Sequence, residues 1–127
     1  PGLAPNGIHI DEEEGNLIVG SWGAVMEGWG TPELKGSLKS INIHTKEIKN
    51  LGKKPIGNLD GIEPDGKGSY FVTDWTGAKL YNINKKGKFK VIAEVGKGAA
   101  DHEVILDKNL IIIPVMAEGK VIALKVK

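Results

Sequence analysis

Asp60-Gly-Ile-Glu-Pro-Asp65, followed by Gly68-Ser-Tyr-Phe-Val-Thr-Asp-Trp75, is the stretch that decides the fold, because the chain repeats its pattern on both sides. An earlier copy spans residues 6–22, and a more divergent copy spans residues 101–115. Each copy consists of a short strand, a tight turn with an acidic residue, and a second apolar strand. Self-similarity with a period of roughly 40–50 residues is typical of propeller blades, which cannot bury their faces alone.

Runs of β-branched and aromatic residues between Gly, Asn and Asp turn signals predict four strands in each of the first two units and three in the last. The predicted strands lie near residues 6–10, 16–21, 37–43, 46–51, 60–64, 69–74, 78–84, 88–94, 101–106, 110–115 and 119–126. Helical periodicity is not convincing anywhere, so we expect little or no helix. The fold class is therefore all-β: one partial β-propeller domain over residues 1–127, whose last blade lacks its outer strand.

A whole propeller usually has four to eight blades, and a lone wedge of three would expose two apolar blade faces. We therefore expect the chain to associate. It is either the C-terminal piece of a longer protein, with the remainder of the propeller as partner, or a homo-oligomer in which copies complete a ring.

The composition argues against several classes of partner. The formal net charge is +1, and all 17 basic residues are Lys, so the chain has no guanidinium fork for phosphates or guanine edges. We expect no nucleic-acid partner. No apolar run approaches the ~20 residues that span a bilayer, so no membrane partner is expected either. Cysteine is absent, and the compartment is not indicated by the sequence.

Asn6, Asp60 and Asp101 occupy equivalent positions, where the innermost strand of each blade begins. Such positions converge at one mouth of the central channel. Ca²⁺ binds 6–8 oxygen ligands, so Asn6 and Asp60 are candidate ligands for Ca²⁺ or another divalent cation. Asp60 is also a candidate general base. The alternative is that Asn6-Gly7 and Asp60-Gly61 are simply turn dipeptides, in which glycine adopts a positive φ.

A long loop, residues 22–36, joins the second and third strands of the first blade and should overhang the same mouth. Its Trp22, Met26 and Trp29 are candidates for a ligand-binding wall or for packing between blades. Trp22 aligns with Trp75 in the repeat, which favours packing. Trp29 has no counterpart, and we take it as a candidate substrate-binding residue.

Asp101 and His102 are further candidates for substrate binding at the mouth, and His102 is the histidine considered for acid–base chemistry. Asp11, Asp65 and Asp107 lie at the far ends of the first strands and are expected in turns. Asp74 and Ser21 end the second strands near the mouth, where they either support the site or, as we expect, form hydrogen bonds between blades.

The segments Pro5-Asn-Gly-Ile8, Leu59-Asp-Gly-Ile62 and Gly15-Asn-Leu-Ile-Val19 resemble the second half of a six-bladed propeller of the regucalcin/gluconolactonase type. The resemblance implies one divalent cation, commonly calcium, at the channel mouth, and hydrolysis of sugar lactones or related esters. It implies that Asn6 and Asp60 are cation ligands and that Asp60 is also the base. Leu59 stands where the family typically has proline. The resemblance also implies that an acidic ligand from the first blade would lie upstream of Pro1.

Two classes of function follow. The first is cation-dependent hydrolysis of a small-molecule lactone or ester in the complete ring. The second is a non-catalytic propeller that binds a protein or a small ligand through the mouth and the long loop. A structural fragment that assembles into a closed ring without a ligand is a third possibility.

Overall fold

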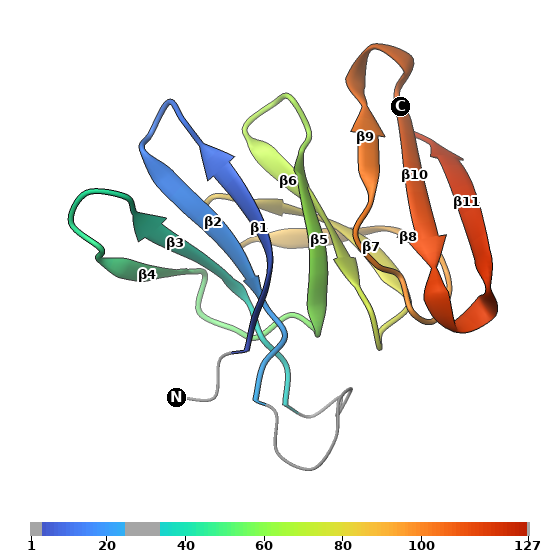
Figure 1. Ribbon diagram of the computed structural model, residues 1–127, viewed down its shortest axis with the longest axis horizontal. Coiled ribbons are helices and arrows are strands. Elements are labelled where there is room, and N and C mark those ends of the chain that lie inside the picture. Colours follow the sequence, from blue (N-terminus) through green and yellow to red (C-terminus); the bar gives the residue numbers. More distant parts are fainter. Residues whose placement is uncertain (1–3, 25–33, 127) are drawn as a thin grey trace.

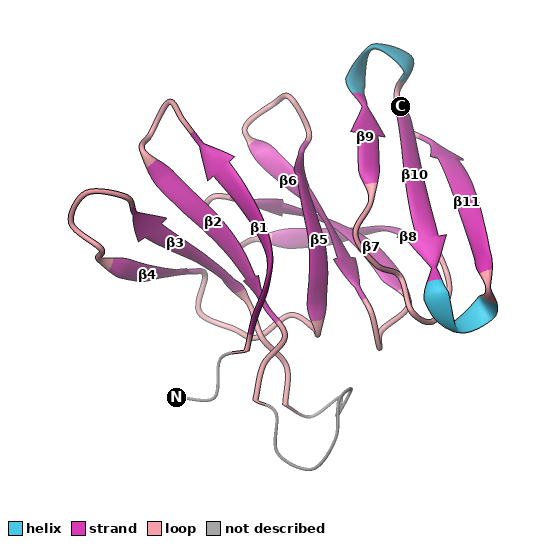
Figure 2. Ribbon diagram, viewed as in Figure 1, coloured by secondary structure: helices cyan, strands magenta, loops and turns pink. Residues whose placement is uncertain are grey.

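Three antiparallel sheets stand side by side like blades of a fan in the computed structural model, which describes residues 4–24 and 34–126 (Figure 1). Their order in space follows their order in the sequence, and Figure 2 shows that almost all regular structure is strand. Within each sheet, consecutive strands are neighbours, so each blade is an antiparallel meander.

Blade 1 consists of β1 (Pro5–Asp11), β2 (Asn16–Ser21), β3 (Leu38–Asn42) and β4 (Ile48–Leu51). Blade 2 consists of β5 (Leu59–Pro64), β6 (Ser69–Asp74), β7 (Lys79–Asn84) and β8 (Phe89–Glu94). Blade 3 has three strands, β9 (Glu103–Ile105), β10 (Leu110–Val115) and β11 (Lys120–Lys125). Among the described residues, this last blade has no fourth, outer strand, which confirms the expectation from the sequence.

Two three-residue 3-10 helices, η1 (Leu106–Lys108) and η2 (Met116–Glu118), close the turns of blade 3. The turn η1 shortens the first strand of that blade, which was expected over 101–106. It ends at Asn109, which has a φ of 51° and accepts the left-handed conformation that asparagine tolerates. No helix in residues 4–24 and 34–126 is long and apolar enough to cross a membrane.

Apolar side chains fill two interfaces between the blades. The first interface, between blades 1 and 2, buries a cluster that includes Ile18, Leu38, Leu59 and Val72. The second interface, between blades 2 and 3, buries a cluster made by Phe71, Leu80, Val95, Ala99, Ile111, Ile113 and Val115. Blade 2 therefore has both faces covered, as alternating side chains on its strands enter the two clusters in turn.

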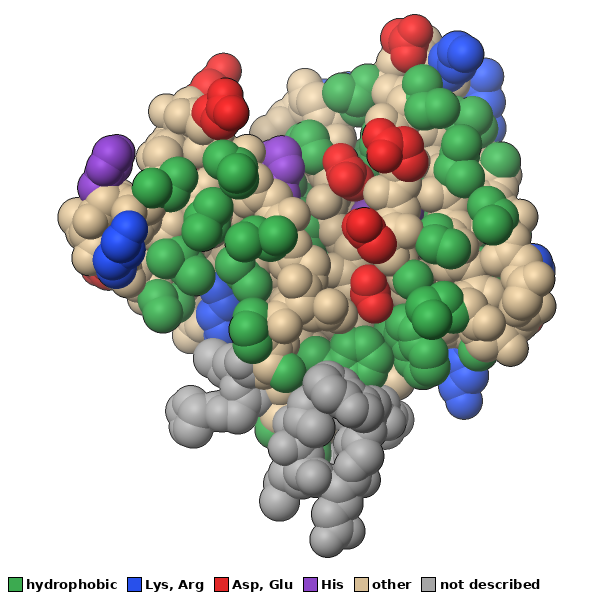
Figure 3. Space-filling view, in the orientation of Figure 1, with side chains coloured by type: hydrophobic (Ala, Val, Ile, Leu, Met, Phe, Trp, Pro, Cys, Tyr) green, Lys and Arg blue, Asp and Glu red, His purple; other side chains and the backbone are tan. Residues whose placement is uncertain are grey.

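The outward face of blade 1 is apolar as well. Ile10, Leu17, Ile41 and Ile48 are paired one after another across all four strands. They lie on the opposite face from Ile18, which enters the first interface. Ile10 and Ile48 are 55% and 63% exposed. Figure 3 shows the resulting apolar side chains over the β1–β4 part of the molecule.

Candidate functional site

Asn6 and Asp60 are neighbours at the beginning of the inner strands β1 and β5. The Nδ2 of Asn6 donates a hydrogen bond to the backbone oxygen of Leu59 over 3.1 Å. The two inner strands approach closely here, because a Cβ at Gly7 would lie 1.8 Å from the backbone oxygen of Asp60. Two residues 54 positions apart in the sequence (60 minus 6) thus share one mouth, because consecutive blades place their first strands side by side.

The glycines after Asn6 and Asp60 are not turn residues, which corrects the alternative interpretation of the two dipeptides. Both lie inside strands, at a register shift that occurs in β1 and again in β5, and neither has a positive φ. Gly7 is needed for close approach: a Cβ there would lie 1.8 Å from the backbone oxygen of Asp60. At Gly61 a Cβ would lie 2.6 Å from Nδ1 of His102. Glycine at these positions lets adjacent inner strands touch.

Four carboxyl groups on the inner strands form what we call the acidic row: Asp60 and Glu63 on β5, Asp101 just before β9, and Glu103 on β9. Figure 3 shows acidic side chains following one another over this part of the molecule. They repel one another electrostatically: Asp60 is affected by Asp101, and Glu63 by Glu103 and Asp101. Repulsion between neighbouring carboxylates favours binding of a proton.

Two members of the acidic row bind protons more tightly than usual. Burial raises the pKa of Asp60, a hydrogen bond from Asn6 opposes the increase, and the Asp101 carboxylate adds to it. Burial also raises the pKa of Glu63, with further repulsion from Glu103 and Asp101. A raised pKa makes a carboxylate a stronger base. Glu63 and Glu103 were not singled out from the sequence, although their positions on inner strands were a usable signal.

His102 is buried rather than open at the mouth. It is only 4% exposed, and neither ring nitrogen has a hydrogen-bond partner among the described residues. Burial lowers the pKa of His102 to about 4, against the opposing influence of the Asp101 carboxylate and the Phe71 backbone. The imidazole is therefore neutral near pH 7.

Thr73 connects blade 2 to the start of blade 3. Its fully buried hydroxyl accepts a hydrogen bond from the backbone N–H of Gly61 over 2.9 Å and donates one to the backbone oxygen of Ala100 over 2.9 Å. This bridge holds Asp101 and His102 beside β5. Thr73 was not expected at this position from the sequence, because its partner Ala100 is 27 residues away.

A buried polar network closes the mouth end of the first interface. The Nδ2 of Asn58 donates to the backbone oxygen of Trp22 over 2.6 Å, and its backbone N–H donates to Oδ1 of Asp74 over 3.0 Å. Tyr81 donates its hydroxyl to Oδ2 of Asp74 over 2.9 Å, and the Thr76 hydroxyl hydrogen-bonds the Asn58 side chain. Asp74 thus joins strands within blade 2 and, through Asn58, ties that blade to blade 1. Asn58, 0% exposed, was missed from the sequence.

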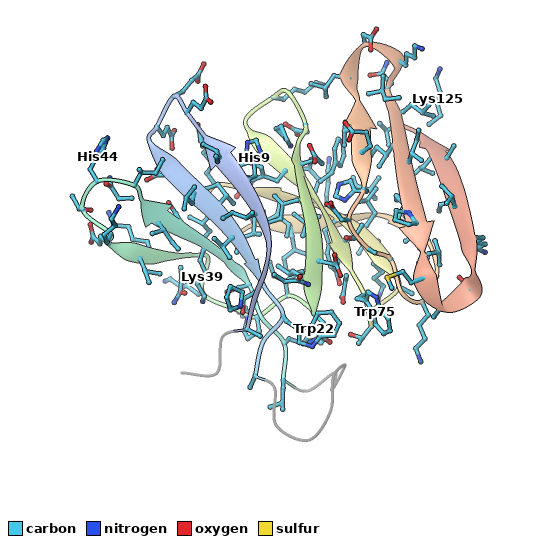
Figure 4. The ribbon with its side chains drawn as sticks, in the orientation of Figure 1. His9, Trp22, Lys39, His44, Trp75 and Lys125 are labelled. Atoms are coloured by element: carbon cyan, nitrogen blue, oxygen red, sulfur yellow. The ribbon has the colours of Figure 1, made fainter. Side chains whose placement is uncertain are left out.

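Trp22 packs against Trp75, the residue with which it aligns in the repeat. Trp22 is 6% exposed, and its ring lies 5.8 Å from that of Trp75, centroid to centroid, so packing between blades is confirmed (Figure 4). Met26 and Trp29 lie outside the described residues.

The residues expected in turns also take the positions inferred for them. Asp65 Oδ1 accepts hydrogen bonds from the backbone N–H groups of Lys67 and Ser69, over 2.7 and 3.0 Å. Asp11 accepts one from the N–H of Glu14 over 3.3 Å, and its carboxylate also meets Lys85 of blade 2 at 3.1 Å.

Comparison with known proteins identifies the architecture. No protein-family model matches the chain, and no curated protein matches it either. A chain in the crystal structure of a nidogen/laminin complex is similar to it with a TM-score of 0.70 and 11% sequence identity, over 97% of this chain and 48% of that one. A gluconolactonase from Xanthomonas campestris, described as important in glucose secondary metabolic pathways, is similar with a TM-score of 0.62 and 17% identity, over 86% of this chain and 34% of that one.

Both of these are β-propeller proteins. Identities of 11% and 17% establish a shared fold, and this chain spans about half of the first protein and a third of the second. The chain is therefore a partial β-propeller of three blades, whose inner strands bring Asn6, Asp60 and the acidic row to one wall.

Proposed function

We propose that the mouth formed by Asn6 and Asp60 is part of a divalent-cation site in a lactonase-like propeller, which hydrolyses a sugar lactone or a related ester when the ring is complete. The observation that carries the proposal is the position of Asn6 and Asp60 side by side at the start of two inner strands, where the Asn6 amide donates to the backbone oxygen of Leu59. The resemblance of both motifs to the regucalcin/gluconolactonase type, and the likeness in fold to a gluconolactonase, support the same function.

The donor set suits a hard cation. Asp60 offers a carboxylate and Asn6 an amide oxygen, the ligand types that Ca²⁺ prefers. Rotation of the Asn6 amide would turn its Oδ1, in place of Nδ2, toward a shared ion. Within the described residues, no three Asp, Glu, His or Cys side chains converge closely enough to hold a metal. The remaining ligands would therefore be waters and groups from other blades, and the affinity of this chain alone should be low.

A bound cation would polarise the carbonyl group of a lactone and stabilise the oxyanion formed on it. Asp60, whose pKa is raised, would accept a proton from the attacking water and return it to the departing ester oxygen as the acyl C–O bond breaks. The acidic row would keep the mouth attractive to cations and disfavour anionic substrates. Thr73 would act as a positioning residue, because its two hydrogen bonds hold Asp101 beside β5.

Calorimetric titration with Ca²⁺ tests the site in the wild type, in Asp60→Asn and in the matched control Asp107→Asn. Asp107 is an exposed acid in η1 at the opposite end of blade 3. The heat of binding should disappear in Asp60→Asn and persist in Asp107→Asn. Equal heats in all three proteins would remove the proposed site. Proton release from gluconolactone, followed with and without Ca²⁺, then tests the reaction itself.

The alternative function is a non-catalytic propeller that binds a protein or small ligand at the mouth. The finding that favours it is the small number of metal ligands among the described residues. It predicts that titration with Ca²⁺ gives no heat of binding in any of the three proteins.

We also propose that further blades, from the remainder of a longer protein or from other copies, cover the row Ile10, Leu17, Ile41 and Ile48. Contiguous apolar faces of this kind are normally buried in a soluble protein. Ile10→Lys should reduce association in sedimentation velocity, whereas Lys53→Glu, on an exposed loop, should not. A sharply monomeric wild type of normal stability would contradict this proposal.

A further inference from the structure

A cavity of about 390 Å³ lies between blades 2 and 3, away from the mouth. Its lining includes Asp65 just after β5, Asn109 just after η1, and Lys125 at the end of β11. The mouth, by contrast, lies where the inner strands begin. The volume is within the range of roughly 300–1,000 Å³ that is typical of small-molecule sites. The proposed hydrolase function does not use this cavity.

The most buried part of the cavity lining is apolar. Phe71 of blade 2 is 9% exposed and belongs to the core of the second interface. Ile92 on β8, Val104 on β9 and Leu124 on β11 are partly buried and pack against the same core. An apolar ligand group placed here would extend an existing hydrophobic cluster, and it would be stabilised in proportion to the apolar surface that it removes from water.

The rim of the cavity is cationic. Lys67, Lys90 and Lys125 line it and are exposed, and Figure 4 labels Lys125 at its place on β11. Among the described residues, neither Lys90 nor Lys125 forms a salt bridge. No ion pair among the described residues therefore competes with an anion for these two lysines.

The single acid of the lining does not cancel this charge. Asp65 is already the acceptor for Asn82, whose Nδ2 lies 3.0 Å from Oδ2, and for the backbone N–H groups of Lys67 and Ser69. With three ammonium groups and one carboxylate, the lining has a formal charge of +2 (3 − 1). Lysine binds an anion as a point charge, without the two-pronged geometry of arginine, which suits a single carboxylate on a flexible chain.

We propose that this cavity binds a medium-chain carboxylate, a molecule with one apolar tail and one anionic head. The tail lies against Phe71, Ile92 and Leu124. The head lies at the rim, between Lys90 and Lys125. Charge complementarity selects the anion, and the apolar interior selects the tail, so an uncharged alcohol of equal length binds less tightly.

Titration of the full chain with decanoate, kept below the concentration at which it forms micelles, tests the proposal through the methyl NMR signals of Ile, Leu and Val. Saturable shifts should appear at Ile92, Val104 and Leu124 and be absent at Ile10 and Ile48. Decanol should bind roughly tenfold more weakly, because it lacks the charge. Sedimentation velocity on the same samples monitors association.

The double variant Lys90→Glu/Lys125→Glu should weaken decanoate binding by at least about tenfold. The matched control Lys53→Glu/Lys54→Glu makes the same change of charge on an exposed loop outside the cavity, and it should keep the affinity within about twofold. Because all four lysines are exposed, both variants should fold.

Three results would overturn the proposal. The first is no saturable shift at the cavity. The second is equal weakening in the two double variants, which would indicate a general effect of charge. The third is binding of decanoate to the outward face of blade 1 in place of the cavity. Occupation of the cavity by a second copy, seen as shifts that depend on protein concentration in the absence of ligand, would overturn the proposal as well. None of these outcomes bears on Ca²⁺ binding at Asp60.

Discussion

The two interfaces of this wedge are built from the same repeat but are closed by different chemistry. At the first interface, Asn58 and Asp74 join the blades through a buried polar network that reaches the Trp22 backbone. At the second, Thr73 makes one bridge to blade 3, and the rest is an apolar cluster with a cavity beside it. A directional network fixes the geometry where Asn6 and Asp60 meet. A looser apolar contact leaves room for a ligand.

The largest loss of unfolding free energy is expected when the Asp74 carboxylate is removed from the first interface. Asp74→Ala deprives the N–H groups of Asn58 and Gly77 and the hydroxyl of Tyr81 of their acceptor. Because each unsatisfied buried donor costs roughly 1–3 kcal/mol, we expect a loss of about 4 kcal/mol of unfolding free energy in urea denaturation. Asp107→Ala, an exposed control in η1, should change stability little; a similar loss in both would contradict the role of the network.

Acidification should weaken the second interface through His102. Its pKa is about 4 in the folded chain, below the ordinary value of 6.5, so between these values the unfolded chain binds the proton more readily. Stability therefore falls as pH decreases through this window, by about 3 kcal/mol in total. The measurement is the pH dependence of urea denaturation for wild type and His102→Leu.

The leucine variant should lose this contribution, so the difference in stability between the two proteins should change steadily from pH 6.5 to pH 4. His44→Leu, at an exposed turn, should leave the dependence intact. Parallel curves for wild type and His102→Leu would show that burial of His102 is not linked to stability.

Substitution of Gly7 and of Gly61 by alanine tests the contact between inner strands at the first and at the second interface, respectively. In Gly7→Ala the new Cβ would meet the backbone oxygen of Asp60 at 1.8 Å, and backbone cannot move away cheaply. In Gly61→Ala it would meet Nδ1 of His102 at 2.6 Å. Overpacking typically costs 1–3 kcal/mol, so we expect about 3 kcal/mol for Gly7→Ala and about 2 for Gly61→Ala by thermal denaturation.

Gly20→Ala is the matched control for these two substitutions. Its Cβ would lie 3.1 Å from Cδ1 of Ile62, the mobile end of a side chain. We expect the smallest loss of the three. A loss in Gly20→Ala as large as that in Gly7→Ala would argue against close backbone contact as the reason for glycine at position 7.

The smallest loss of stability is expected for the ion pairs of Lys85, which lie where the first strand of blade 1 ends. Lys85 contacts Asp11 at 3.1 Å and Glu14 at 2.8 Å. The side chains of Lys85 and Glu14 are 39% and 53% exposed, so Lys85→Ala should cost less than about 1 kcal/mol, and the loss should shrink in high salt. Lys86→Ala tests the neighbouring exposed lysine, and an equal, salt-independent loss in both variants would exclude an ionic contribution.

The strands could be predicted from the sequence because their signals are local. Apolar runs bounded by glycine, asparagine and aspartate placed β2, β6 and β10 at their observed limits. The blade count and the missing last strand followed from the repeat. Asn6 and Asp60 were brought together for the same reason, since equivalent positions of consecutive blades lie side by side.

The remaining features depend on partners that are far apart in the sequence. Asn58 reaches the Trp22 backbone, 36 residues away, and no local pattern marks it as buried. Gly7 and Gly61 resemble turn glycines because the dipeptides Asn-Gly and Asp-Gly are common in turns. Their actual role, contact between inner strands, appears only when the next blade is in place. The burial of His102 was hidden for the same reason.

The position of blade 2 between two neighbours has a consequence for the rates at which backbone amides exchange with deuterium. In repeat proteins each unit is stabilised mainly by its contacts with adjacent units, and local opening begins where those contacts are fewest. The N–H groups of β6 and β7 should therefore exchange last, and those of β4 and β11 first. Opening would proceed inward from both flanks and leave the central sheet as the final protected element.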